Sequence, residues 1–227
     1  MLVAEDLALL LHDDDSGKGV ADRNTVGLAL AGAVLVELAL LGRVRVAGDD
    51  EDAKEGRLVL EGDGPVGDDL LDDGLAIVAT KEGRRPKATL EKLRRGLRER
   101  VLERLVAAGE LRREEHQALK VFTTTRWPAG DGHREDEVRR LVHGALLDGE
   151  DPDERTAALV GLVDAIDATT KVVPSDDRKA LKRRAKEIAD GPWAADAVRS
   201  AVRDVQVAVM TAVITSTTVG TIAGSGT

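Results

Sequence analysis

The 227-residue chain contains no cysteine and no tyrosine, and it has only one phenylalanine and two tryptophans. The absence of cysteine excludes disulfide bonds and metal sites built from thiolates. Aromatic residues make up 1% of the chain and hydrophobic residues 42%, so the core must be built from leucine, valine and alanine. Small aliphatic side chains favour closely packed helices, and the composition therefore predicts a mainly α-helical fold.

Motifs for catalysis and for cofactor binding are also missing. The histidines, at positions 12, 116, 133 and 143, do not form the pair three or four residues apart that a helical zinc site needs. The sequence contains no phosphate-binding loop, no dinucleotide-binding glycine motif and no nucleophile elbow. The acidic run 13–15 could ligate a metal ion, but such a run is more typical of a solvated loop or a helix cap. We therefore expect no enzymatic activity, no cofactor and no metal.

Two features of the sequence bear on localisation. No basic-then-apolar leader precedes the first helical pattern, and this favours a cytoplasmic protein. Residues 205–223 carry no charge and are long enough to cross a bilayer. Their many threonines, with Arg203 and Asp204 just before them, favour a buried terminal helix instead.

Apolar residues that recur at spacings of three and four predict a series of helices. The predicted helices cover residues 2–11, 24–42, 68–79, 90–111, 134–148, 153–170, 175–190 and 194–215. The second is almost entirely apolar and should be the central core helix, in which the carboxylate of Glu37 needs a partner. Residues 43–46 and 57–61 should pair as one hairpin, and residues 121–133 should form a second hairpin or an extended loop. We expect one domain over residues 1–215 and a flexible tail over residues 216–227.

Charge is distributed unevenly along the chain. The net charge is -9, yet basic residues outnumber acidic ones over residues 81–104. Arg95 and Arg98 stand three positions apart within the predicted helix 90–111, a spacing that lets two guanidinium groups converge on one phosphate. The alternative is a solvated helix face with Glu–Arg pairs such as Glu91 with Arg95.

Four segments in a fixed order resemble the Golgi phosphoprotein 3 family. They are VLVELALLGRVRV (34–46), GPVGDDLLDDGL (64–75), LRRGLRERVLERLVAAGEL (93–111) and VFTTTRWP (121–128). The resemblance runs from about Leu2 to Val213. It implies a single-domain helical bundle with surrounding amphipathic helices and a projecting β-hairpin, and peripheral membrane binding through phosphatidylinositol 4-phosphate. The composition, rich in alanine, valine, glycine, aspartate and arginine, is typical of GC-rich bacterial genes, so we expect a bacterial relative of the eukaryotic Golgi adaptors.

The resemblance also implies binding residues. In the eukaryotic members a tryptophan, an arginine in the helix that follows it, and two arginines three apart on a later helix hold the lipid head group. The last two match Arg95 and Arg98. The tryptophan falls near Asp22 and the first arginine near Ala31, so half of the pocket is retained, with Arg23 as a possible additional phosphate contact.

The family's hairpin is apolar and inserts into the bilayer. The matching residues here are Phe122, Arg126, Trp127 and Pro128, which we predict to contact the membrane. An indole ring favours the membrane interface, and an adjacent arginine suits an anionic surface. The alternative is that both aromatic rings pack beneath the hairpin.

Together these features predict a cytoplasmic, peripherally membrane-associated module that binds an anionic phospholipid head group, phosphatidylinositol 4-phosphate by resemblance. The alternative is a soluble protein–protein interaction scaffold of the same fold that has lost lipid binding. Its hairpin would hold a protein partner or a second copy of the chain. We expect no nucleic-acid binding, because the chain is acidic overall and no second basic element accompanies residues 92–104.

Overall fold

The computed structural model describes residues 1–227 except 13–19, 48–53, 82–84, 119–121, 194–195 and 223–227. Within that part the chain is 63% helical, with ten α-helices and two small antiparallel sheets of two strands each. The mainly α-helical fold that the composition predicted is thus confirmed.

The helices differ in length from four to 27 residues. They are α1 (Val3–Leu10), α2 (Arg23–Leu40), α3 (Asp69–Ala79), α4 (Pro86–Leu93), α5 (Leu97–Ala107), α6 (Arg134–His143), α7 (Glu154–Ala165), α8 (Thr169–Val172), α9 (Arg178–Asp190) and α10 (Asp196–Ile222). A π-helical turn, η1 (Gly144–Asp148), continues α6. The strands are β1 (Val44–Val46), β2 (Leu58–Leu60), β3 (Glu114–Ala118) and β4 (Phe122–Arg126).

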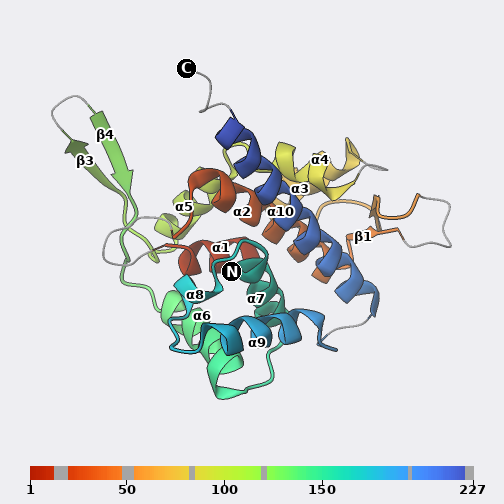
Figure 1. The fold of residues 1–227 in the computed structure, drawn as a ribbon. Helices are drawn as coiled ribbons and strands as arrows, with labels where there is room; N and C mark the ends of the chain where they lie inside the picture. Colours follow the sequence, from red (N-terminus) through yellow and green to blue (C-terminus); the bar gives the residue numbers. More distant parts are fainter. Residues whose placement is uncertain (13–19, 48–53, 82–84, 119–121, 194–195, 223–227) are drawn as a thin grey trace.

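Helix α2 forms the centre of the molecule, as its apolar sequence predicted. Every residue from Thr25 to Ala39 is buried, and the helix packs against α1, α3, α7 and α10 (Figure 1). By length and hydropathy α2 could also cross a membrane, but 83% of that window is buried inside the protein. A helix that is apolar on all sides is typical of a protein core, and this is the place that α2 occupies.

Buried carboxylates on α1 and α2 are paired with arginines from other helices. Glu37 accepts hydrogen bonds from Arg155 Nη1 at 2.7 Å and from the backbone N–H of Val3 at 2.6 Å, so the partner that Glu37 required is found. Asp6 accepts two hydrogen bonds from Arg134, at 2.8 and 2.7 Å. Buried charges need such partners, and these pairs tie α1 and α2 to α6 and α7.

Helix α10 crosses α2 closely at Gly32. A Cβ atom at this position would lie 2.5 Å from Val209 Cγ2 and 3.2 Å from Leu162 Cδ2, whereas one at Gly27 in the same helix would meet Arg94 at an ordinary 3.7 Å. We expect Gly32→Ala to lower the free energy of unfolding by about 1–3 kcal/mol through overpacking. Gly27→Ala should raise it by up to about 1 kcal/mol, because alanine favours the helix. Urea denaturation of both variants tests this, and equal effects would contradict the close crossing.

The predicted helix 90–111 is wrong, because the chain forms two helices there. Helix α4 begins at Pro86 and ends at Leu93, and α5 begins at Leu97. Between them Gly96 has a φ of +69°, a left-handed conformation that an α-helix does not contain. Gly109, with a φ of +78°, follows the end of α5 as predicted.

The residue range of the first hairpin was predicted more accurately than that of the second. Strands β1 and β2 pair antiparallel as predicted, with Arg45 opposite Val59. The second hairpin begins earlier than predicted, because β3 pairs with β4 from Glu114↔Arg126 to Ala118↔Phe122. The segment 127–133 is therefore not part of this hairpin's ladder, and Ala129 bridges back to Leu111 instead. Figure 1 shows this hairpin projecting from the helical body.

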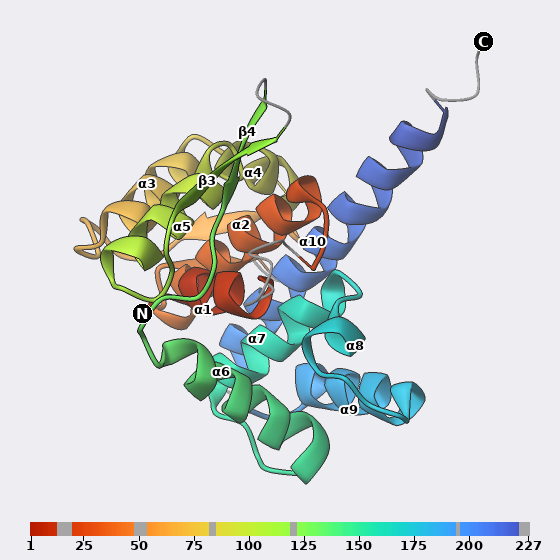
Figure 2. The same cartoon turned by 90° about the vertical axis from the view of Figure 1, so that its left-hand side faces the viewer.

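Helix α10 is buried on one face only. Its residues Val202, Val205 and Val209 lie in the core, whereas Val207 and Ile214 are exposed. The buried terminal helix predicted from the sequence is thus confirmed for one face of the described part of α10. The helix continues to Ile222 rather than ending near residue 215, and Figure 2 shows its last turns extending past the other helices.

Candidate anion-binding site

A small cavity of about 150 Å³ gathers arginines from three separate parts of the chain. It lies between the start of α2, one side of α5 and the end of the hairpin where β3 begins and β4 ends. It is lined by Arg23, Arg98, Glu99, Glu103, Arg113, Thr125 and Trp127. Three guanidinium groups against two carboxylates give the cavity a net positive charge.

Arg98 is the most buried cation of this cavity. Its side chain is 14% exposed, and its Nη2 lies 3.3 Å from His12 Nε2. Its Nη1 is 3.6 Å from Glu99 Oε1, a long ion pair. Burial lowers the pKa of Arg98; Glu99 raises it, and the nearby positive charge of Arg23 lowers it further. Arginine stays protonated in proteins, so Arg98 carries a positive charge that the long ion pair with Glu99 neutralises only in part. It can therefore bind an anion.

Arg113 and Trp127 form the wall of the cavity on the hairpin side. The guanidinium carbon of Arg113 lies 5.8 Å from the centre of the Trp127 ring, within the range of a cation–π contact. Trp127 is only 6% exposed and belongs to the core. Arg113 was not among the binding residues predicted from the sequence, because no motif or helical spacing marks it. The signal that would have revealed it is the pairing of β3 with β4, which brings the residue before β3 beside the residue after β4.

Arg23 comes from the first turn of α2, where Asp22 is the N-cap. The carboxylate of Asp22 accepts hydrogen bonds from the backbone N–H groups of Asn24 and Thr25, at 3.0 and 3.1 Å, and from the Thr25 hydroxyl at 2.5 Å. The hydroxyl bond is the main reason that the pKa of Asp22 is lowered. Asp22 therefore satisfies its own helix end and is not among the residues lining the cavity, whereas Arg23 beside it is.

Arg95 and Arg98 do not lie in the same cavity. Arg95 is in the turn before α5 and lines a different cavity, of about 210 Å³, together with Lys92 and Arg100. The predicted convergence of the two arginines required one continuous helix, and the left-handed Gly96 removes that geometry.

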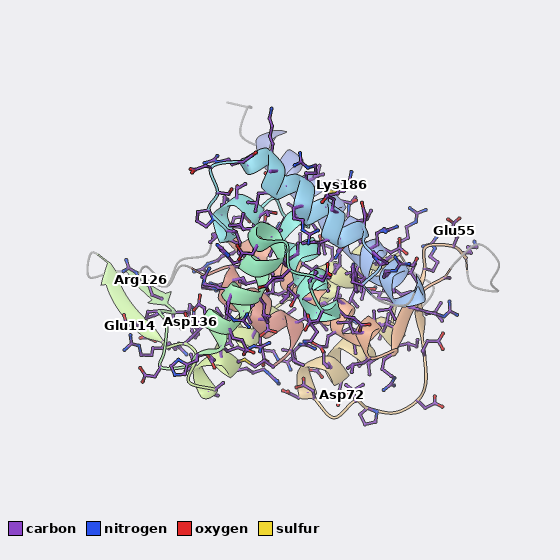
Figure 3. All side chains as sticks on the ribbon, turned by 90° about the horizontal axis from the view of Figure 1, so that it is seen from below. Glu55, Asp72, Glu114, Arg126, Asp136 and Lys186 are labelled. Atoms are coloured by element: carbon purple, nitrogen blue, oxygen red, sulfur yellow. The ribbon has the colours of Figure 1, made fainter. Side chains whose placement is uncertain are left out.

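The hairpin residues predicted to contact a membrane are also separated. Arg126 and Glu114 form the register pair at the base of the hairpin, and Figure 3 shows both on the arm that extends from the body. Trp127 follows β4 and is buried in the hydrophobic core, so this ring is not exposed for contact with a membrane. Pro128 is half-buried beyond it, and its carbonyl accepts a hydrogen bond from Arg112. Phe122 is at the far end of β4, and its side chain lies outside the described part of the structure.

Among the described residues, no group of three histidine, aspartate or glutamate side chains is placed to hold a metal ion. The acidic run 13–15 lies outside the described part of the chain.

A family model for Golgi phosphoprotein 3 matches residues 3–205 of the chain. The chain belongs to the Golgi phosphoprotein 3 family. The match includes every residue that lines the cavity and confirms the resemblance drawn from four segments. Ala31, near which the resemblance places the family's first arginine, is fully buried in α2. The resemblance implied four binding positions, and of these only Arg98 lines this cavity in the present Golgi phosphoprotein 3 family member. The other residues that line the cavity lie at different positions.

His12 makes the stability of the protein dependent on pH. Its ring is buried, and burial is the main reason that its pKa is lowered below 6.5. The unfolded chain takes up a proton near pH 6.5, whereas the folded protein does so only at a lower pH, so the free energy of unfolding should fall as the pH drops through and below 6.5. Between pH 7.5 and 5.5 this loss should be at most about 1.4 kcal/mol. Urea denaturation at both pH values should show a smaller loss for His12→Gln; an equal loss would contradict the assignment.

Proposed function

We propose that this Golgi phosphoprotein 3 family member is a peripheral membrane-binding module that holds the phosphate of an anionic lipid head group. The proposed site is the cavity of Arg23, Arg98 and Arg113, and the family resemblance favours phosphatidylinositol 4-phosphate as the lipid. One observation carries the proposal: three arginines from three separate segments line one small cavity, and the central one is largely buried. The site would act on the cytoplasmic side of a membrane.

The chemistry of the cavity suits a terminal phosphate. Guanidinium groups donate paired, charge-assisted hydrogen bonds to phosphate oxygens. A phosphomonoester carries a charge of about -1.5 to -2 at neutral pH, more than the single charge of a phosphodiester lipid. The carboxylates of Glu99 and Glu103 lie in the same cavity, so only an anion of high charge density gains from the excess of arginine. This argument favours a lipid with a terminal phosphate over anionic lipids in general.

A single head group gives weak attachment, so a second contact with the membrane is part of the proposal. The hairpin of β3 and β4 begins at the cavity and projects from the body (Figure 1). A hairpin that touches the same surface would add its own contact to the head-group contact, and two linked contacts bind far more tightly than either alone.

Co-sedimentation with vesicles tests the proposal. Four compositions are compared: phosphatidylinositol 4-phosphate, phosphatidylinositol and phosphatidylserine at matched charge, and phosphatidylcholine alone. We expect the protein to pellet preferentially with the first, and Arg98→Ala to weaken that binding by about tenfold. Equal binding to all anionic vesicles would contradict recognition of a terminal phosphate, and no binding to any would contradict membrane binding altogether.

A second candidate function is a soluble interaction scaffold of the same fold. It is favoured by the separation of Arg95 from Arg98 and by the two glutamates in the cavity, which together weaken the family pocket. The projecting hairpin would then hold a protein partner or a second copy of the chain. Absence of vesicle binding together with a concentration-dependent dimer in light scattering would support this function over the first.

A further inference from the structure

His12 is a buried side chain whose two ring nitrogens have different partners. Nδ1 lies 2.7 Å from the carbonyl oxygen of Ala8, and Nε2 lies 3.3 Å from Nη2 of Arg98. A carbonyl oxygen can only accept a hydrogen bond, and a guanidinium can only donate one. The two partners therefore fix the tautomer: Nδ1 carries the proton and donates to Ala8, and Nε2 is the acceptor for Arg98.

The surroundings keep this imidazole neutral and fixed in place. His12 is 2% exposed, and its backbone carbonyl accepts a hydrogen bond from Arg139 of α6 at 3.0 Å. Burial and the adjacent positive charge of Arg98 both lower the pKa of His12, while its hydrogen bond to Ala8 raises it. The charged groups bonded to His12 from neighbouring elements, Arg98 on α5 and Arg139 on α6, are both cations, so protonation of the ring is unfavourable.

We infer that His12 is a positioning residue that orients the guanidinium of Arg98 toward the anion-binding cavity. This inference rests on the proposed function. The bond to Nε2 uses one N–H of Nη2 and leaves the remaining N–H groups for a phosphate. Without it Arg98 could turn toward the carboxylate of Glu99, whose Oε1 is already 3.6 Å from Nη1. A closer ion pair with Glu99 would neutralise the arginine that the ligand needs.

The geometry of histidine allows a matched pair of variants. In His12→Asn the amide nitrogen stands where Nδ1 stood and can still donate to Ala8, but nothing replaces the acceptor for Arg98. In His12→Gln the longer side chain brings a carbonyl oxygen to the place of Nε2, and the acceptor is retained. Both variants lose the imidazole ring, so a purely structural role predicts similar effects of the two on binding.

The test measures the affinity of each variant for vesicles containing phosphatidylinositol 4-phosphate, with thermal unfolding recorded alongside. We expect His12→Asn to weaken binding by about tenfold and His12→Gln to remain within about threefold of the wild type. In an Arg98→Ala background, His12→Asn should cause no further loss, because the residue acts through Arg98.

Each outcome separates the inference from the function on which it rests. If the wild type binds no vesicle, the proposed function fails. If the wild type binds and the two His12 variants bind equally well or equally poorly, the positioning role is overturned while the proposed function stands. A further loss in the Arg98→Ala background would also overturn it, since His12 would then act by another route.

Discussion

Arg134→Ala is expected to lower the free energy of unfolding by about 3–5 kcal/mol. Asp6 is fully buried in α1, and Arg134 donates both Nε and Nη2 to its two oxygens. Asp6 also raises the pKa of Arg134, mainly through these hydrogen bonds. Without Arg134 the nearest cation is Arg155, whose Nη2 is 4.0 Å from Asp6 and is already bonded to Glu37. The substitution therefore leaves a buried carboxylate without adequate pairing.

Arg100→Ala is the matched control. Arg100 also forms a close ion pair, with Nη1 2.8 Å from Asp73 Oδ2, but its side chain is 42% exposed and that of Asp73 is 62% exposed. Exposed pairs contribute little, so this variant should lose no more than about 1 kcal/mol. Urea denaturation followed by circular dichroism measures both. If the two substitutions lower the free energy of unfolding equally, the buried ion pairs around α1 do not stabilise the fold as described.

Arg98→Glu is expected to weaken binding to phosphatidylinositol 4-phosphate vesicles by about a hundredfold, because charge-assisted hydrogen bonds are replaced by like-charge repulsion. The new carboxylate would stand beside Glu99 and Glu103, which line the same cavity. Arg23 and Arg113 would then face three acidic groups, and the net positive charge of the cavity would be lost. The loss should appear at physiological salt, where long-range attraction between exposed charges is largely screened.

Arg95→Glu changes the net charge by the same amount and serves as the control. Arg95 is exposed and lines a different cavity, so its reversal should alter affinity by no more than about threefold at physiological salt. The family resemblance alone predicts the opposite, since it gives both arginines equal roles in binding the head group. Equal losses for the two variants would show that the head group bridges both cavities and would contradict the site proposed here.

The break between α4 and α5 shows where a sequence pattern misleads. Leu93 and Leu97, on either side of the break, are both buried, and their spacing of four continues the period of a single helix. Apolar spacing reports which residues face the core, and both helices present their leucines to the same core. The pattern therefore predicted burial correctly and hid the left-handed turn at Gly96, on which the location of Arg95 depends.

Elements with a strong local pattern were predictable, and contacts between distant elements were not. The apolar run of α2 predicted the core, and the carboxylate of Glu37 predicted a partner, although not that this partner would be Arg155. Strand β3 has the sequence EEHQA, with no β-branched residue, and it forms because β4 pairs with it. The contacts of Arg98 with His12 and of Arg113 with Trp127 follow from that pairing and from helix packing, so no local signal in the sequence marks them.

The central claim is that the cavity beside Trp127 binds the phosphate itself, and the fluorescence of this ring tests it most directly. The chain has two tryptophans, and Trp193 lies away from the site, in a cavity beside α9. Trp193→Phe therefore leaves Trp127 as the only reporter. Titration with inositol 1,4-bisphosphate, the soluble head group, avoids any contribution from a bilayer.

We predict a saturable change in Trp127 emission that disappears when Arg98→Ala is added to the Trp193→Phe protein. The complementary variant, Trp127→Phe, should show no change in the emission of Trp193. An emission of Trp127 that stays constant through the titration, or one that changes equally with and without Arg98, would contradict the claim that this cavity holds the head group.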